Sequence, residues 1–376
     1  MMQKIIAESI NLQVENAISE KKKWISLTGL CNNNCIFCLD GDKKGRFHKS
    51  ENQVKKEIDD GLKEGAARLV LSGGEPTIHP KIIDFVRYGK EKGYKKIQII
   101  SNGRMLAYSS FADSLKKAGL DEVTFSLHGH TKELHETLTG INGSFNQIIT
   151  GIKNAQRAGF IVNTDTTITK INYRHLPETI SFIHSLGINE VNLMSIVPFG
   201  NAWENRKEVL YKPEEVVPYL HKGIDFCKKK NMVLWFSRFP VEYLEGCEKY
   251  IESYKKIVEE VLAREEDFFR KPNCKGERCG YCGIRDVCDD IVAGLKDYSY
   301  AVYSEPPCLE NEKMRSGKVE RIKKAGSFRQ YVEEIGKNSV IKRISCKSCR
   351  FDIKCRGIGR EYARTHGFGN AKPIKN

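Results

Sequence analysis

The fold is decided by the stretch Trp24-Ile-Ser-Leu-Thr-Gly-Leu-Cys31-Asn-Asn-Asn-Cys35-Ile-Phe-Cys38, in which a short apolar run leads into three cysteines. The run is typical of a buried strand, and the polar residues after it are typical of a loop. Three thiolates on one loop can hold three irons of a 4Fe-4S cluster and leave the fourth iron open. A zinc site would need one more ligand, for which His48 is the nearby candidate. The spacing favours the cluster.

Composition places the chain among ordinary globular proteins. It has 376 residues, 40% of them hydrophobic and 29% charged, which predicts one large α/β domain and a smaller one. No apolar run approaches the roughly 20 residues of a membrane helix, and the N-terminus lacks the apolar stretch of a secretory signal. We therefore expect a cytoplasmic protein without a membrane partner.

Charge and cysteine content narrow the classes of function. The net charge is +14, but its lysine-rich stretches are typical of solvated helix ends, so nucleic acid is not the expected partner. A basic face would equally suit an acidic peptide or a phosphorylated small molecule. In a reducing compartment, clustered thiols among thirteen cysteines indicate metal or cluster ligation rather than disulfides.

Strand-like apolar runs alternate with amphipathic stretches from about residue 24 to residue 236, which predicts βα units around a parallel sheet. The expected strands are Trp24 to Leu27, Arg68 to Leu71, Lys96 to Ile100, Glu122 to Ser126, Ile161 to Ile168 and Glu190 to Met194. The expected helices are Glu51 to Lys63, Pro80 to Lys92, Ser109 to Lys117, Ser144 to Ala158, Leu176 to Leu186 and Pro213 to Lys229. Glycines that would end five of these helices are Gly65, Gly93, Gly119, Gly159 and Gly187. Six repeats favour a partial (β/α)6 TIM-type barrel.

In such barrels the residues after each strand gather at one end, where the chemistry takes place. That ring contains the cysteine loop, the run Ser72-Gly73-Gly74-Glu75-Pro76, the pair Ser101-Asn102 and the segment Ser126-Leu127-His128-Gly129. Glycines let backbone approach a ligand, and hydroxyl, amide and carboxylate groups can bind its polar atoms. Taken alone, the glycine run could equally be a plain turn.

From Ser237 to Asp267 the sequence is aromatic and charged, and a loop-rich region with eight cysteines follows. They are Cys274, Cys279, Cys282, Cys288, Cys308, Cys346, Cys349 and Cys355. The spacing C-x2-C-x5-C occurs twice among them, which indicates two similar ligand loops, for one or two further clusters or for zinc. Between the loops, Val319 to Lys337 is expected to be helical, whereas Cys227 and Cys247 are expected to be buried thiols.

The first cysteine loop resembles the radical S-adenosylmethionine (SAM) superfamily, whose signature is C-x3-C-x-aromatic-C, with Phe37 as the aromatic residue. The resemblance covers residues 22 to 236. It implies that Cys31, Cys35 and Cys38 hold a catalytic 4Fe-4S cluster, that SAM chelates its free iron, and that reductive cleavage of SAM yields a 5′-deoxyadenosyl radical that abstracts hydrogen from a substrate.

The resemblance also implies which residues contact SAM. They are Phe37, Gly73, Gly74, Glu75, Ser101, Asn102 and Ser126. His128 stands where many relatives have Asp. Relatives often carry an Arg near Thr139 that contacts the carboxylate of SAM, and this chain has none there. Arg104 is the candidate to replace that contact.

The cysteine-rich region is similar to the SPASM or twitch extensions of these enzymes, which bind auxiliary 4Fe-4S clusters. The usual run would place a further cysteine at Gly359, so the assignment of ligands to clusters is left open. We expect an N-terminal extension over residues 1–21, a radical SAM partial barrel over 22–236 and an auxiliary cluster domain over 237–376.

Three functions compete. The first is oxidative modification or cross-linking of a peptide or protein side chain, supported by a flavodoxin or ferredoxin-type reductant and by a separate peptide-recognition protein. The second is radical chemistry on a small molecule such as a sugar, nucleotide or tetrapyrrole precursor. The third, a non-catalytic electron carrier or zinc-stabilised RNA-binding protein, explains the cysteines but not the polar ring at the strand ends.

Overall fold

The computed structural model describes residues 20–251, 253–262, 276–281, 288, 291, 296–303, 319–342, 344–348 and 357–368. Its centre is one sheet in the order β1-β2-β3-β4-β5-β6-β7, and strands β1 to β6 pair in parallel. The strands are β1 Lys22–Ser26, β2 Arg68–Ser72, β3 Lys96–Ser101, β4 Glu122–Ser126, β5 Ile161–Ile168, β6 Glu190–Ser195 and β7 Val233–Ser237. This sequential order is that of a partial barrel, as expected.

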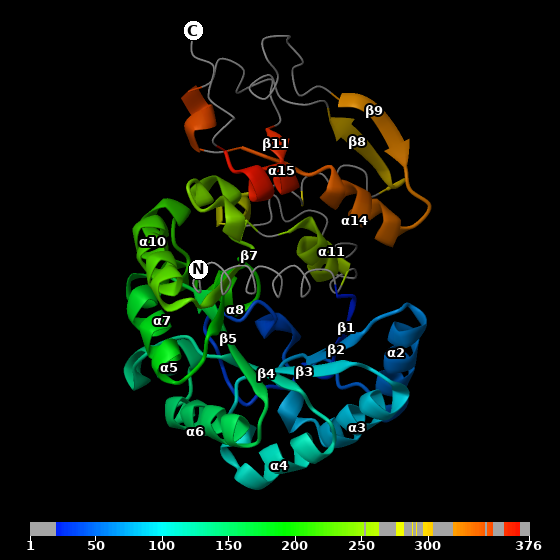
Figure 1. Ribbon diagram of the computed structural model, residues 1–376, viewed down its shortest axis with the longest axis vertical. Helices are drawn as coiled ribbons and strands as arrows, with labels where there is room; N and C mark the ends of the chain where they lie inside the picture. The colour runs from blue at the N-terminus through cyan, green and yellow to red at the C-terminus, as the bar shows by residue number, and fades with distance from the viewer. Residues whose placement is uncertain are drawn as a thin grey trace, which may run out of the picture. The chain divides into compact units, whose positions relative to one another are not determined.

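Helices cover the outer face of this sheet (Figure 1). They are α2 Glu51–Lys63, α3 Ile82–Lys92, α4 Ser109–Lys117, α5 Lys132–Thr139, α6 Ser144–Arg157, α7 Leu176–Ser185 and α10 Pro213–Lys230. Two short helices, α8 Asn201–Glu204 and α9 Arg206–Val209, follow β6. Short 3-10 helices are η1 Gly41–Lys43, η2 Pro76–Ile78, η3 Met105–Ala107, η4 Tyr173–His175, η5 Val241–Leu244, η6 Glu248–Tyr250, η7 Glu277–Tyr281 and η8 Ile344–Ser348.

Apolar and polar side chains alternate along the strands, so the two faces of the sheet differ. Leu69 and Leu71 of β2 and Ile97 and Ile99 of β3 are fully buried, as residues two apart on one face must be when helices pack on it. The alternate positions are largely polar, for example Gln98 on β3, whose amide donates to Thr124 Oγ1 on β4 at 2.7 Å. The barrel therefore has an apolar outer layer under its helices and a polar inner face.

The five expected helix-ending glycines all adopt left-handed backbone, with φ between 75° and 107°. Glycine takes this conformation without the steric cost that a Cβ would bring. These residues end the helices where the pattern of the sequence predicts.

The structure corrects three expectations. A seventh strand, β7, lies beyond the six expected. Helix α5 was not among the expected helices, although Thr131 caps its start by accepting from the Leu134 amide at 3.2 Å. The stretch Val319 to Lys337 is half strand and half helix, because tertiary pairing overrides local helical propensity in its first half.

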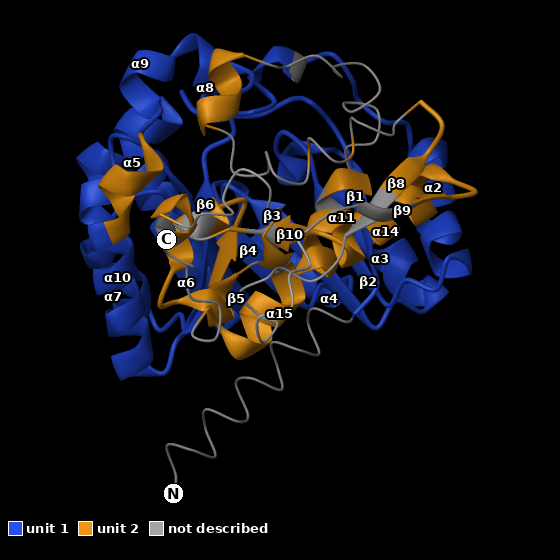
Figure 2. Ribbon diagram, turned by 90° about the horizontal axis from the view of Figure 1, so that it is seen from above, with its two compact units in different colours: residues 1–211, 218–234 blue, residues 212–217, 235–376 orange. Residues whose placement is uncertain are grey.

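The chain forms two compact units, one of residues 1–211 and 218–234 and one of residues 212–217 and 235–376 (Figure 2). The second unit contains α11 Tyr254–Leu262, β8 Ser299–Tyr303, β9 Val319–Lys324, α14 Phe328–Lys337, β10 Val340–Ile341, β11 Ile358–Gly359 and α15 Arg360–His366. Strands β8 and β9 pair antiparallel, as do β10 and β11.

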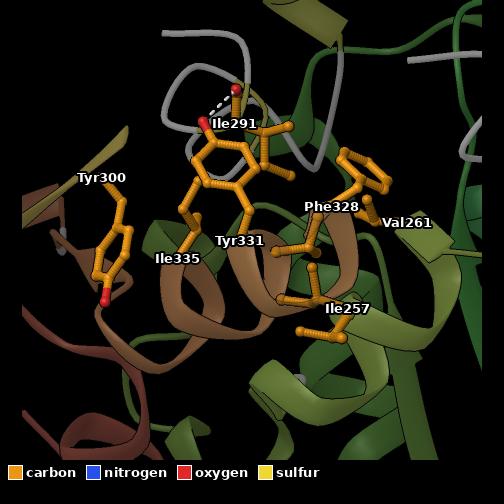
Figure 3. Close-up of a cluster of buried hydrophobic side chains, with 9 residues drawn as sticks. Ile257, Val261, Ile291, Tyr300, Phe328, Tyr331 and Ile335 are labelled. Carbon is orange, nitrogen blue, oxygen red and sulfur yellow. Dashed lines mark hydrogen bonds between the residues drawn. The ribbon is translucent and has the colours of Figure 1, made fainter. Parts of the chain in front are cut away.

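The second unit has its own apolar core (Figure 3). Phe328, Tyr331 and Ile335 of α14 pack with Ile257 and other residues of α11 in one buried cluster. The Tyr331 hydroxyl donates to the Ile291 carbonyl at 2.6 Å, which satisfies its polar atom inside the apolar surroundings.

Of the expected N-terminal extension, residues 1–19 lie outside the described part of the chain. Among the helices that are described, none combines the length and apolarity needed to cross a bilayer.

A buried ion pair crosses the inner face of the sheet. Arg68 on β2 lies 2.5 Å from Glu122 on β4, and both residues are 6% exposed. Glu20 accepts from Arg68 Nε at 2.8 Å, and Asn163 on β5 donates to Glu122 at 2.8 Å. The network ties β2, β4 and β5 together and leaves neither charge without a partner.

Replacing Arg68 with Met is expected to lower the free energy of unfolding by about 3 to 5 kcal/mol, because it leaves the Glu122 carboxylate buried without its cation. Denaturant unfolding measures this. The matched control is Arg157→Ala, which breaks the 2.9 Å pair with Asp113 where the side chains are 52% and 43% exposed, and should cost less than about 1 kcal/mol. Equal losses in the two variants would contradict the role assigned to the buried pair.

Candidate active site at the carboxyl end of the barrel

The three cysteines lie on the loop that follows β1, as the sequence predicts. Cys31, Cys35 and Cys38 are each partly buried. Within the loop, the Asn33 amide donates to Cys31 Sγ at 3.4 Å and the Cys38 amide to the Cys35 carbonyl at 3.2 Å. The loop is therefore folded back on itself, with its thiols gathered in one region.

Helix α5 holds the middle of the cysteine loop through its last turn. The amides of Asn34 and Ile36 donate to the carbonyls of Thr139 and Leu138 at 2.9 Å and 3.1 Å. Gly140 follows the helix at a φ of 67°, and a Cβ there would lie 2.6 Å from the Asn34 carbonyl oxygen. These carbonyls at the helix end would lack partners inside α5, so the cysteine loop satisfies them.

A second contact comes from α8, which follows β6. Asn201 donates from its amide to the Cys38 carbonyl and from its side chain to the Cys35 carbonyl, both at 2.9 Å. Asn205 donates to the Ile36 carbonyl at 2.9 Å. Asn201 and Asn205 are not among the residues that the sequence motifs indicate; the usable signal is their spacing of four residues just after a barrel strand.

The segment after β3 holds the start of the loop. Arg104 donates to the Asn32 carbonyl and, at 3.1 Å, to Asn33 Oδ1, while its Nε donates to Gln147 at 2.5 Å. Asn102 donates to Asn32 Oδ1 at 2.6 Å. The guanidinium of Arg104 thus binds the cysteine loop, and its contact with the carboxylate of SAM stays a prediction.

The glycine run after β2 packs backbone to backbone on the residues before Cys31. The Gly74 amide donates to the Thr28 carbonyl at 2.6 Å, and the Glu75 amide donates to the Leu30 carbonyl at 2.8 Å. A Cβ on Gly74 would lie 2.2 Å from the Leu30 oxygen, which is a severe clash. Glycine is therefore required for this approach, and the run is more than a plain turn.

The Glu75 carboxylate is turned into the protein and is 1% exposed. One oxygen accepts from the Thr77 amide at 3.0 Å and from the hydroxyls of Thr77 and Ser101 at 2.5 Å and 2.8 Å. The other accepts from the Asn102 amide at 2.7 Å. Burial raises the pKa of Glu75, and these hydrogen bonds act in the opposite direction. Glu75 thus joins the glycine run to the segment after β3.

The donor set fits a cluster better than a single metal ion. Burial raises the pKa of Cys35, and the nearby Cys38 and Cys31 raise it further, so positive charge is needed to hold the three as thiolates. In the part of the chain that the structure describes, no three His, Cys, Asp or Glu side chains converge as ligands of one ion. A cubane places each thiolate on its own iron. His48, the candidate zinc ligand, instead lies against Thr28 Oγ1 at 3.2 Å.

Phe37 of the cysteine loop packs in a row with two histidine rings. Phe37 meets His128 edge to face at 4.7 Å, and His128 stacks on His135 of α5 at 6.0 Å. Thr167 and His128 donate their amides to the Nδ1 atoms of His128 and His135, respectively, so both rings carry their proton on Nε2. Burial and the neighbouring His135 lower the pKa of His128 to about 3, and burial lowers that of His135 to about 4.

Ser126 ends β4 beside Asp165 of β5 and is partly exposed on the barrel's inner face. It lies two residues before His128, at the carboxyl edge of the sheet. This position is consistent with the contact to SAM that its place in the sequence predicts, which stays a prediction.

In the second unit the structure describes Cys279, Cys288 and Cys346, all partly buried. Cys279 lies on η7 and Cys346 on η8. The other expected ligands, Cys274, Cys282, Cys308, Cys349 and Cys355, lie outside the described residues. Cys227 is fully buried in α10 and Cys247 is 6% exposed, as expected of structural thiols.

Several known proteins are similar to parts of this chain. The Radical SAM superfamily matches residues 25–183. A "Probable GTP 3′,8-cyclase" of Sulfurisphaera tokodaii is 32% identical over 203 residues, or 54% of this chain and 64% of that protein. Another, of Metallosphaera sedula, is 32% identical over 179 residues, or 47% of this chain and 56% of that protein. The chain thus spans less than two thirds of these relatives.

Among solved structures, Streptococcus suis SuiB bound to S-adenosylmethionine has a TM-score of 0.51 and 17% identity, covering 70% of this chain and 57% of SuiB. Likeness at this identity concerns the fold. The cysteine loop lies inside residues 25–183, which match the Radical SAM superfamily of enzymes, and the likeness to SuiB is one of fold.

The two buried histidines predict a specific loss of stability in acid. Their folded pKa values lie below the unfolded value of about 6.5, so the unfolded chain binds more protons and stability falls as the pH drops below about 6.5. Each histidine contributes a loss of about 1.4 kcal/mol per pH unit there. His135→Gln should remove its share, measured by urea unfolding at pH values of about 6 and 5.

His184→Gln is the matched control, because His184 is a partly exposed histidine of α7 outside the stack. It tests the loss of a histidine side chain away from the stack. If His135→Gln has the same slope as the wild type, the pair is charged in the folded state and the assignment of the tautomers is wrong.

Proposed function

We propose that this chain is a radical SAM enzyme whose catalytic 4Fe-4S cluster is held by Cys31, Cys35 and Cys38. The observation that carries the proposal is the loop itself: three neighbouring thiols on a strand-end loop that α5, α8 and the segments after β2 and β3 all hold in place. A loop fixed from so many sides is suited to a cluster whose fourth iron stays open to an outside ligand.

Cys31, Cys35 and Cys38 would hold the cluster, which in its reduced form would supply the electron for reductive cleavage of SAM and so for hydrogen abstraction from the substrate. The chain's share is to position the cofactors, set the cluster's redox properties and exclude water. For direct contacts with SAM we propose the backbone of Gly73 and Gly74, the ring of Phe37 and the Ser126 hydroxyl. For Glu75, Ser101 and Asn102 we propose a supporting role, because their polar atoms bind protein groups.

For the second unit we propose an auxiliary cluster domain of the SPASM or twitch kind, with one or two 4Fe-4S clusters on its eight cysteines. Its repeated C-x2-C-x5-C spacing supports this. Auxiliary clusters can accept an electron from a substrate radical, so the proposed reaction is oxidative modification or cross-linking of a peptide side chain. A flavodoxin or ferredoxin-type reductant and a separate peptide-recognition protein are the proposed partners.

A second candidate is radical chemistry on a small molecule, in particular a nucleotide. The supporting observation is the 32% identity to proteins named as probable GTP 3′,8-cyclases. That similarity covers 54% and 47% of this chain, so the activity of those proteins comes to it only as a proposal.

Replacing Cys31, Cys35 and Cys38 together by Ala should abolish formation of 5′-deoxyadenosine from SAM under dithionite, because no thiolate would remain to hold the catalytic cluster. Iron bound by the second unit should remain. Liquid chromatography and iron analysis on anaerobically reconstituted protein measure both. The control Cys227→Ala removes a fully buried thiol of α10 and should keep full SAM cleavage. Continued cleavage by the triple variant would refute the proposed loop.

The substrate class is decided by mass spectrometry of candidate substrates incubated with reconstituted enzyme, SAM and reductant. A peptide encoded beside the gene should lose about 2 Da, the mass of two hydrogens, if the enzyme cross-links or dehydrogenates it. A changed GTP with an unchanged peptide would reject the peptide in favour of the nucleotide.

A further inference from the structure

Asn102 places a side-chain donor next to the sulfur of a predicted cluster ligand. Its Nδ2 lies 3.9 Å from Cys31 Sγ, within hydrogen-bonding range for sulfur, and 2.6 Å from Asn32 Oδ1. An amide nitrogen has two hydrogens, so both contacts can be made together. The Asn33 amide also donates to Cys31 Sγ, at 3.4 Å.

The orientation of this amide is fixed by the groups around it. Asn102 Oδ1 accepts from the Arg104 amide at 3.1 Å, so the oxygen faces away from the sulfur and the nitrogen faces toward it. The Asn102 backbone is held by Glu75 Oε2 at 2.7 Å, and the residue is 8% exposed. A flipped amide would place two donors together at Arg104 and two acceptors together at Asn32. The N–H is therefore directed at Cys31 by the fold.

A hydrogen bond to a cluster ligand has a known physical consequence. Reduction adds negative charge to the cluster, and part of it resides on the thiolate sulfurs. A donor aimed at such a sulfur stabilises the reduced form more than the oxidised form, which raises the reduction potential. Asn102 is 71 residues from Cys31 in sequence, so the effect depends on the tertiary fold.

We infer that Asn102 is a positioning residue that raises the reduction potential of the cluster on Cys31, Cys35 and Cys38 through its Nδ2–H···Sγ bond to Cys31. The inference rests on the proposed function, since it requires that cluster. Its consequence is that the barrel sets how strong a reductant the enzyme needs before SAM can be cleaved.

The test is a potentiometric titration followed by electron paramagnetic resonance on the full-length, anaerobically reconstituted protein. The signal of the catalytic cluster is recognised because it changes when SAM is added. Asn102→Ala removes the donor, and Asn102→Asp is isosteric and faces the sulfur with an oxygen. Both variants should shift the midpoint to more negative potential, and Asn102→Asp should shift it further because its carboxylate repels the added electron.

Asn32→Ala is the matched control. It removes the other acceptor of Asn102 Nδ2 and loosens the same loop, but leaves the donor to Cys31, so its midpoint should stay close to that of the wild type. Iron content is measured in every sample to confirm that the same cluster is compared.

Unchanged midpoints in both Asn102 variants would overturn the inference, and so would an equal shift in Asn32→Ala. Loss of the cluster from both Asn102 variants would overturn it as well, because Asn102 would then serve assembly rather than tuning. If the wild type itself lacks a SAM-responsive cluster, the proposed function fails first, and the two failures are thereby distinguished.

Discussion

The close backbone packing of Gly73 and Gly74 on Thr28 to Leu30 is the constraint on which the site depends. With a carbonyl oxygen 2.2 Å from where a Cβ of Gly74 would lie, no other residue type fits without moving the chain. This packing joins the ends of β1 and β2, which are neighbours in the sheet. The loop that carries the cysteines starts from that junction, so its first residues have a fixed position and direction.

A network of buried hydrogen bonds holds the rest of the cysteine loop at the end of the barrel. Glu75 receives donors from Thr77, Ser101 and Asn102, and Arg104 and Asn102 in turn bind the first asparagines of the cysteine loop. On the opposite side, α5 and α8 bind the middle and the end of that loop. A polar network in which the donors and acceptors are paired rigidifies its surroundings. Here it fixes the backbone of the loop that carries Cys31, Cys35 and Cys38.

The two units differ in their features and in the roles proposed for them. The first has a polar inner face, a buried ion pair and the family match; the second has a small apolar core built on α11 and α14 together with most of the cysteines. The proposed radical chemistry belongs to the first. The second carries the proposed auxiliary clusters.

By itself, the sequence determined the barrel, six of its strands nearly to the residue, the helix-ending glycines and the cysteine loop. These are local signals: apolar period, left-handed glycine positions and motif spacing. The tertiary structure decided what the residues around the motif do. Glu75 and Ser101 proved to bind each other, Arg104 to bind the cysteine loop, and Asn201 and Asn205 to hold it from more than 160 residues away. Such roles depend on which strand ends meet in space, and a buried carboxylate or guanidinium takes the partners that the fold brings within hydrogen-bonding distance.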